Sequence, residues 1–256
     1  MNRHLLLTLT LMTGAAAEAR AQAPAPLRLE VGSAEVDGRV YPPHRARNRV
    51  YPPGATTSTT SWTNELTLGD SAGVPVMRWV TIGTQPNGTT WELLQTYNAR
   101  TLAPMSYSYR NSAGFEKVFG VHGTHIGGHI RTPTDSVARP IDWMLPRLGF
   151  MASASDLVPP AVGLRAGAVM SVPVWNADSV APAQHYFRVL EQRTVSVEGV
   201  DVVAWPVEER VEATDELKAT WYLVDRSPYM VLAEIPTPNG LLRITGVDEP
   251  EVDRRP

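Results

Sequence analysis

Apolar and polar residues alternate over short stretches near the C-terminal end of the chain. Residues 219–224 read Ala-Thr-Trp-Tyr-Leu-Val, and this period of two predicts a β-strand. Residues 225–228, Asp-Arg-Ser-Pro, end the strand with turn chemistry. Residues 238–240, Pro-Asn-Gly, favour a hairpin, because Asn and Gly accept positive backbone angles. The stretch from Lys218 to Val247 therefore predicts an antiparallel meander.

The same pattern recurs upstream, where short apolar runs are separated by turns rich in Gly, Asn and Pro. The clearest alternation places Met105, Tyr107 and Tyr109 on one face of a strand, so we expect that face to be buried. Strands are expected over 65–68, 74–81, 89–96, 105–110, 115–121, 125–131, 168–175, 185–197 and 200–213. With the meander, the pattern predicts an all-β fold: a single curved antiparallel sheet of roughly ten strands that forms an incomplete β-barrel.

One segment, residues 140–158, interrupts the strand pattern and predicts a small helical insertion. Pro140 stands where a first helical position would be, and Gly149 where a C-terminal cap would be. Pro146 prevents a long helix, because it removes a backbone donor. We therefore expect short helical turns that cover the sheet with one apolar face. That face would consist of Ile141, Met144, Leu145 and Leu148.

The first 21 residues have the pattern of a signal peptide. A short polar stretch at 2–4 precedes an apolar run at 5–17, and residues 19–21, Ala-Arg-Ala, have the small-x-small form that signal peptidase cuts. The run is shorter than the roughly 20 strongly apolar residues of a membrane-spanning helix. We expect export to the periplasm or the extracellular space, with Gln22 as the mature N-terminus.

Between the signal peptide and the sheet, residues 22–61 predict a Pro-rich leader and an extended strap. The sequence Arg-Val-Tyr-Pro-Pro occurs at 39–43 and again at 49–53, and paired prolines favour extended backbone. This strap would either lie on the domain or present a Pro/Tyr surface to a partner protein of the cell envelope. The β domain itself is expected over 62–248, followed by a C-terminal tail at 249–256.

Composition excludes several other classes of protein. The chain of 256 residues contains no cysteine, which excludes disulfides, thiolate metal sites and a lipid-anchored cysteine. The formal net charge is −3, and removal of residues 1–21, with two arginines and one glutamate, changes it to −4. This mild negative charge argues against a nucleic-acid partner. No later segment predicts a transmembrane helix.

Five short stretches carry a family resemblance. They are residues 91–97 (Trp-Glu-Leu-Leu-Gln-Thr-Tyr), 100–104 (Arg-Thr-Leu-Ala-Pro), 105–109 (Met-Ser-Tyr-Ser-Tyr), 163–167 (Gly-Leu-Arg-Ala-Gly) and 221–225 (Trp-Tyr-Leu-Val-Asp). Together with the helical break, they resemble an uncharacterised exported family of bacterial domains that is similar to the lipoprotein carriers LolA and LolB. The resemblance covers about Glu65 to Val247. It implies an incomplete antiparallel barrel with an apolar concave face under short helices. It defines no catalytic residue, and the missing cysteine departs from LolB-like proteins, which are lipid-anchored.

An open barrel with a helical cover leaves room for an apolar ligand such as a lipid. We expect such a cavity between the concave sheet face and residues 140–158, where Pro146 and Gly149 would let the cover shift. The sequence therefore favours an exported, non-enzymatic binding or carrier domain that needs no cofactor. The expected lining residues are Trp79, Trp91, Tyr107, Phe119, Trp143, Leu145 and Trp221.

Three histidines provide the alternative of a metal-assisted hydrolase. If residues 123–124 form a two-residue turn, His122 and His125 face each other across a hairpin, whereas His129 lies roughly 13 Å along the strand. At most two of the imidazoles could then share one ion, so we expect no bound transition metal. A structural module of the cell envelope is the other alternative.

Other kinds of catalytic site have no local support in the sequence. No serine stands in a Gly-x-Ser-x-Gly elbow. A group of carboxylates lies close together near the C-terminal strands, and we expect it to form a solvated acidic edge rather than a catalytic pair. These residues are Glu208, Glu209, Glu212, Asp215 and Glu216.

Overall fold

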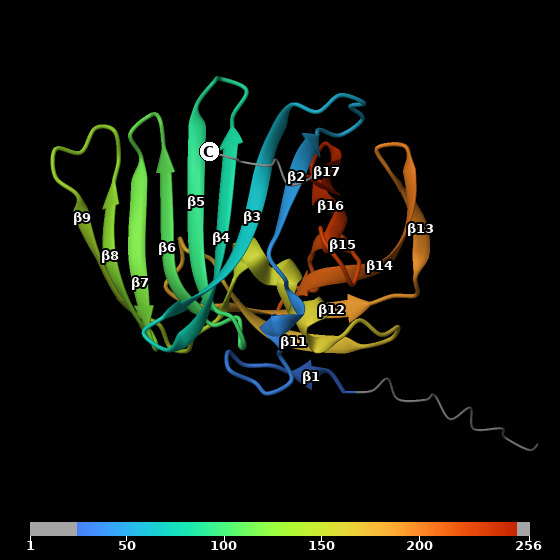
Figure 1. Ribbon diagram of the computed structural model, residues 1–256, viewed down its shortest axis with the longest axis horizontal. Helices are drawn as coiled ribbons and strands as arrows, with labels where there is room; N and C mark the ends of the chain where they lie inside the picture. Colours follow the sequence, from blue (N-terminus) through green and yellow to red (C-terminus); the bar gives the residue numbers. More distant parts are fainter. Residues whose placement is uncertain (1–24, 250–256) are drawn as a thin grey trace, which may run out of the picture.

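A computed structural model describes residues 25–249, which form one open, mostly antiparallel sheet of 17 strands (Figure 1). The first nine strands are β1 (Leu27–Arg28), β2 (His44–Tyr51), β3 (Thr60–Ser71), β4 (Val74–Thr84), β5 (Thr90–Asn98), β6 (Pro104–Asn111), β7 (Glu116–His122), β8 (His125–Arg131) and β9 (Arg139–Met144). The others are β10 (Phe150–Met151), β11 (Val169–Trp175), β12 (Ala183–Val189), β13 (Arg193–Val197), β14 (Val200–Val211), β15 (Leu217–Leu223), β16 (Met230–Thr237) and β17 (Gly240–Asp248). The predicted all-β class is confirmed, with more strands than expected.

Strands that are neighbours in the sheet are mostly neighbours in sequence, as short turns dictate. Each strand from β2 to β8 pairs with the next, and β14 to β17 form the predicted C-terminal meander. At the other end, β1 and β10 pair with β11 in parallel. Over the described residues β9 pairs only with β8, so no backbone ladder closes the sheet. The predicted incomplete barrel is therefore confirmed.

The structure corrects the predicted strap at 22–61. Its second half contains β2, which lies inside the sheet between β17 and β3 and joins the two meanders. Ala46 and Asn48 of this strand are buried. The prolines at 42–43 and 52–53 flank the strand, where no ladder hydrogen bond is lost. The paired prolines therefore lie at the two ends of a strand. The prediction of an extended strap was wrong for residues 44–51, because it took the prolines as a property of the whole segment.

One face of the sheet, called the inner face from here on, carries the main apolar core. Two short helices, η2 (Ala152–Leu157) and α1 (Val158–Val162), pack in this core through Leu157, Val158 and Ala161. A third, η1 (Gly38–Val40), precedes β2. Side chains join the two ends of the sheet. The rings of Phe119 and Trp175 are 5.5 Å apart.

Lys117 makes a second connection between the two ends of the sheet. Its side chain is 5% exposed, and its Nζ donates hydrogen bonds to the carbonyl oxygen of Ala177 at 2.5 Å and to the carboxylate of Asp178 at 2.6 Å. A buried ammonium group needs such partners, because desolvation of a charge is costly. Contacts from β7 to the end of β11 and to the residues after it therefore connect the two ends of the open sheet.

The predicted helical cover at 140–158 is displaced along the chain. Residues 139–144 form β9, with Ile141 in the core and Met144 69% exposed, so the four apolar residues share no helix face. Helical turns begin at Ala152, and Pro159 lies in the first turn of α1, where its missing donor costs nothing. A short apolar run fits both periods, which explains the wrong assignment of residues 140–144.

The predicted long strand at 185–197 is two strands, because the chain leaves the main ladder at 190–192. β12 pairs with the second half of β14, whereas β13 pairs with its first half. Residues 193–204, called the arm from here on, thereby fold over the outer face of the sheet, opposite the main core. Figure 1 shows β13 standing apart from the other strands. A second, smaller apolar cluster holds the arm: Val195, Val197, Val202, Ala204, Tyr222, Val224, Val231, Leu232 and Val247.

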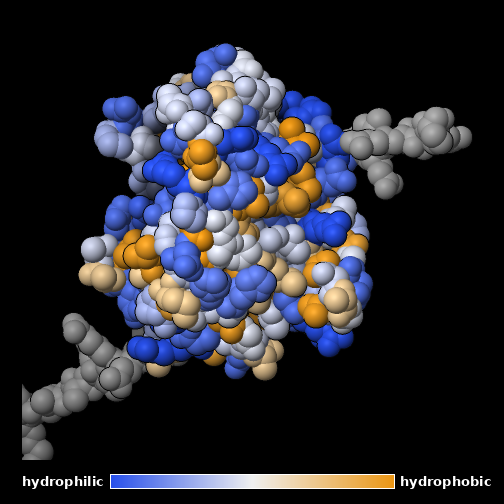
Figure 2. Space-filling model, turned by 90° about the vertical axis from the view of Figure 1, so that its left-hand side faces the viewer, coloured by the Kyte–Doolittle hydropathy of each residue, from blue (hydrophilic) through white to orange (hydrophobic). Residues whose placement is uncertain are grey.

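The predicted signal peptide and Gln22 lie outside the described residues, as does the tail beyond Glu249. From residue 25 to residue 249, none of the helices has the length and apolar character needed to span a bilayer. Figure 2 shows the β9 side of the molecule, where hydrophobic residues lie in several separate groups among hydrophilic ones.

Candidate functional site

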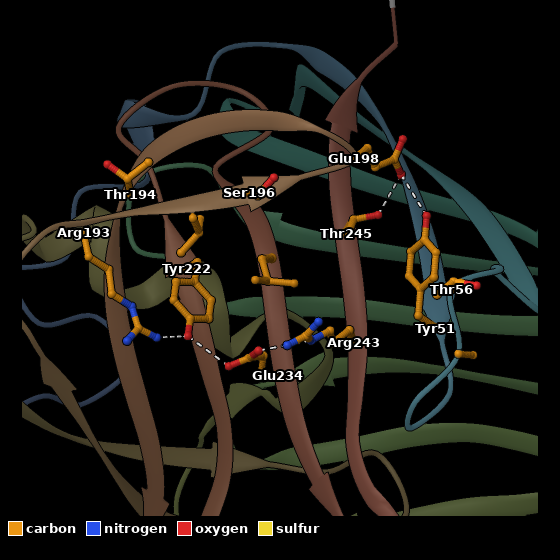
Figure 3. A pocket seen from close by; sticks show the side chains of 13 residues that line it. Tyr51, Thr56, Arg193, Thr194, Ser196, Glu198, Tyr222, Glu234, Arg243 and Thr245 are labelled. Atoms are coloured by element: carbon orange, nitrogen blue, oxygen red, sulfur yellow. Dashed lines mark hydrogen bonds and ion pairs between the residues drawn. The ribbon is translucent and has the colours of Figure 1, made fainter.

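A groove lies on the outer face, between the arm and strands β15, β16, β17 and β2 (Figure 3). The arm forms its roof and the strands its floor. Its volume is about 620 Å³, and typical small-molecule sites measure roughly 300–1,000 Å³. The lining residues are Tyr51, Ala55, Thr56, Arg193, Thr194, Val195, Ser196, Glu198, Tyr222, Leu232, Glu234, Arg243 and Thr245.

Alternation along the strands makes the floor of the groove polar. Side chains of successive residues point to opposite faces, so Trp221 faces the core whereas Tyr222 faces the groove. Glu234 lies directly opposite Arg243 across β16 and β17. The Tyr222 hydroxyl donates to Glu234 Oε2 at 2.9 Å, and Arg243 Nε donates to Glu234 Oε1 at 3.2 Å. The floor therefore carries one continuous hydrogen-bonded row.

The arm extends this row with Arg193. Its Nη2 donates a hydrogen bond to the Tyr222 hydroxyl, and its guanidinium carbon lies 4.9 Å from the centroid of the Tyr222 ring. Burial raises the pKa of Tyr222 above its ordinary value, and the hydrogen bond to Glu234 raises it further. The tyrosine is therefore neutral at physiological pH, and the row Arg193–Tyr222–Glu234–Arg243 links roof and floor (Figure 3).

Glu198, at the tip of the arm, ties the other end of the groove to the sheet. Its carboxylate accepts hydrogen bonds from Arg49, from the Thr245 hydroxyl at 2.8 Å and from the Tyr51 hydroxyl at 3.4 Å. The Glu198 side chain is 21% exposed. Partial burial and three donors fix this carboxylate in place, so the far end of the arm is anchored by polar contacts.

The two Arg-Val-Tyr-Pro-Pro copies have different roles. In the first, Tyr41 is fully buried and its hydroxyl donates to the carbonyl oxygen of Leu157, which holds η2 against the core. In the second, Arg49 and Tyr51 contact Glu198 and border the groove. The copy at 39–43 therefore contributes to the core, and the copy at 49–53 contributes to the candidate site.

The charged residues of the groove are held by hydrogen bonds to one another and to residues of neighbouring strands. Its serine and threonine residues are Thr56, Thr194, Ser196 and Thr245, and within residues 25–249 none of them is hydrogen-bonded to a histidine. A serine or threonine nucleophile needs such a base. The charged groups are instead arranged to hold hydrogen bonds in fixed directions.

The residues predicted to line an inner cavity lie mostly in the packed core. Trp79, Phe119 and Leu145 are 7%, 2% and 4% exposed. Tyr107 stacks on Phe119 at 4.8 Å between ring centroids, and burial raises the pKa of Tyr107 to about 12. Trp143 and Trp221 are partly buried and pack against the same cluster.

Trp91 lies apart from those six residues. It is partly exposed, and its ring centroid is 6.3 Å from the centroids of Trp62 and Tyr109. No Cβ would fit at Gly83, because it would lie 2.6 Å from the Trp91 ring. The structure therefore places Trp91 in a separate aromatic row on β3, β5 and β6.

The predicted histidine geometry is confirmed. His122 and His125 are directly opposed across the turn at 123–124, and His129 pairs further along with Val118. His125 Nε2 lies 2.6 Å from a carboxylate oxygen of Asp142. In the part of the chain that the structure describes, no group of three or more His, Cys, Asp and Glu residues is placed to hold a metal ion.

The predicted acidic edge needs a correction at Glu209, which is 5% exposed and faces the core side. Its carboxylate accepts a hydrogen bond from Trp221 Nε1 at 2.8 Å and lies 2.7 Å from His185 Nδ1. Asp156 of η2 is nearby. Burial of its carboxyl raises the pKa of Asp156 to about 7, and the charge of Glu209 adds to the rise. Period-two alternation places Glu209 on the inner face, a signal that the acidic cluster obscured.

The comparisons with known proteins give one similar structure. No protein-family model and no curated protein matches the sequence. Among solved structures, the chain is similar to a "beta-barrel-like protein of domain of unknown function DUF1849" from Brucella abortus, with 10% identity and a TM-score of 0.46. The match covers 80% of this chain and 96% of that chain. The resemblance to lipoprotein carriers stays a prediction.

Proposed function

We propose that this chain is a non-catalytic ligand-binding domain of an exported protein, and that it holds a small polar ligand in the groove under the arm. The observation that carries the proposal is the groove of about 620 Å³, whose four charged residues are held by two hydrogen-bonded networks, one at each end. Export is supported by the apolar run and small-x-small site in residues 1–21.

This proposal moves the ligand from the inner face to the outer face. An apolar carrier on the inner face would need space beside Trp79, Phe119 and Leu145, and these side chains are buried against other core residues. Displacing packed aromatic and aliphatic groups costs several kcal/mol. The groove needs no such displacement, because it is already open to solvent.

Native mass spectrometry of gently purified, exported protein tests the proposal. We expect a co-purifying small molecule on the wild-type chain. Val195→Trp should lose it, because Val195 lies on the face of the arm that packs toward the sheet and lines the groove. Val200→Trp is the matched control: Val200 is 64% exposed at the arm tip and does not line the groove, so this variant should keep the ligand.

Retention of the ligand by Val195→Trp, or its loss in Leu145→Trp instead, would contradict the outer-face site. The mass of the exported chain tests export separately. A chain that begins at Gln22 supports it, whereas an uncleaved chain in the cell would reject it.

A further inference from the structure

The ion pairs around the groove, as far as residues 25–249 show them, leave one of its charged residues without a partner. Glu234 is paired with Arg243, and Glu198 with Arg49, which lies just outside the groove. Across residues 25–249, no carboxylate oxygen lies within 4.0 Å of the Arg193 guanidinium. One positive charge is therefore left at the start of the arm.

The contacts of Arg193 leave most of its donors available. A guanidinium carries five N–H donors, and the Tyr222 hydroxyl accepts from one of them. Tyr222 donates its own proton to Glu234 and is neutral, so it supplies no counter-charge. The planar fork of arginine matches carboxylate and phosphate groups, which accept two parallel hydrogen bonds. Arg193 is thus built to receive an anionic group from outside the chain.

The remainder of the groove suits hydroxyl groups rather than a hydrocarbon chain. Tyr51, Thr56 and Thr245 contribute hydroxyl groups to its lining. A carboxylate offers about four acceptor positions, so Glu198, with three hydrogen bonds, and Glu234, with two, can each accept another. The aliphatic lining is limited to Ala55, Val195 and Leu232. An acyl chain would leave this polar lining without partners.

We propose that the groove binds a saccharide that carries a carboxylate or a phosphate group. The anionic group lies against Arg193, and sugar hydroxyls donate to Glu198 and Glu234. This inference rests on the proposed function, because it assumes that the groove is the ligand site. The two anionic groups share one chemistry at Arg193, and the choice of probes separates them.

Titrations of isotope-labelled protein, followed by amide chemical shifts, test the inference with four probes. These are glucuronic acid, glucose 6-phosphate, glucose and inorganic phosphate. We expect glucuronic acid or glucose 6-phosphate to bind about tenfold or more tightly than glucose, since a hydrogen bond to a charged group contributes about 1.5–3 kcal/mol. Whichever of the two binds more tightly identifies the anionic group. The shifts should centre on residues 193–198 and 222.

Variants of exposed arginines add the matched control. Arg193→Ala should weaken binding of the anionic sugar about tenfold and leave the weak binding of glucose unchanged. Arg193→Lys should restore part of the affinity, because the charge returns without the planar fork. Arg188→Ala removes an exposed arginine of β12 that does not line the groove, and it should change nothing. Melting temperatures confirm that each variant is folded.

Three results would overturn the inference. Equal affinity for glucose and the anionic sugars would reject the role of Arg193. Inorganic phosphate bound as tightly as glucose 6-phosphate would reject the saccharide. If none of the probes causes shifts, although the protein carries a co-purified ligand that is lost in Val195→Trp, this ligand class would be rejected and the proposed function would stand.

Discussion

The two faces of the same strands have opposite character. Trp221 and Ala233 face the main core, whereas their neighbours Tyr222 and Glu234 face the groove. On the inner face, side chains from distant strands fill the space between them. On the outer face, the arm is held by a small apolar cluster and by polar contacts, and it leaves a groove. The main core thus lies on one face of the curved sheet, and the groove that we propose as the binding site lies on the other.

The largest expected effect comes from emptying the inner face. Phe119→Ala removes a ring that stacks on Tyr107 and contacts Trp175, so the free energy of unfolding should fall by about 3–5 kcal/mol. Chemical denaturation measures this change. The folded variant should bind the ligand of the groove with the affinity of the wild type. Weaker binding by a variant that is still folded would show that the two faces are not independent.

Overfilling the inner face should also destabilise the protein. Leu145 is 4% exposed in the core, so Leu145→Trp should lower the free energy of unfolding by about 1–3 kcal/mol. Thermal and chemical denaturation measure the loss. A variant as stable as the wild type would reveal an inner cavity and would return the carrier hypothesis to the inner face.

A pH dependence should arise from Asp156 on the inner side. Its pKa is about 7 in the folded state and has its ordinary value, near 4, in the unfolded chain, so folding favours the protonated form. Its contribution is greatest below about pH 4 and is lost as the pH rises to about 7. Because the residue is partly exposed, we expect the loss to be about 1–2 kcal/mol.

Asp156→Asn isolates this contribution from other titrating groups. The variant should gain stability relative to the wild type between pH 4 and pH 7, and the difference should stay constant above that range. Denaturation curves at several pH values give the difference directly. If the stability difference between variant and wild type does not vary with pH, Asp156 has its ordinary pKa in the folded protein, and the prediction is wrong.

The smallest effect on stability should come from the outer face. Tyr222→Phe removes the hydroxyl between Arg193 and Glu234 and should cost about 0.5–1.5 kcal/mol. Ligand binding should respond more strongly than stability, because the hydrogen-bonded row is interrupted. Denaturation and a ligand titration on the same sample measure both. A loss larger than that of Phe119→Ala would show that the groove residues are part of the core.

Much of the fold follows from local patterns in the sequence. Tyr107 and Tyr109 alternate with serines, and Asn239 with Gly240 favours a tight turn, so β6 and the C-terminal meander could be predicted from spacing alone. The secondary structure of residues 140–144 could not be predicted in this way, because an apolar run of that length fits the helix period and the strand period equally well. Tertiary pairing with β8 decides between them.

The candidate site was missed for a different reason. The arm arises where the polar pair Glu191 and Gln192 interrupts an apolar alternation, and the prediction continued the strand through it. The groove then depends on residues from β2, β13, β15, β16 and β17, which no local pattern connects. The interruption at 191–192 is the one signal that could have located the roof of the groove.

A crystallographic fragment screen tests the central claim, that the outer groove and not the inner face is the ligand site. The fragments would include neutral sugars, sugar acids, sugar phosphates and short fatty acids. We predict electron density for sugar acids or phosphates between Arg193, Tyr222 and Glu234, under the arm. Density for fatty acids on the inner face between η2 and Trp221, with an empty groove, would contradict the claim.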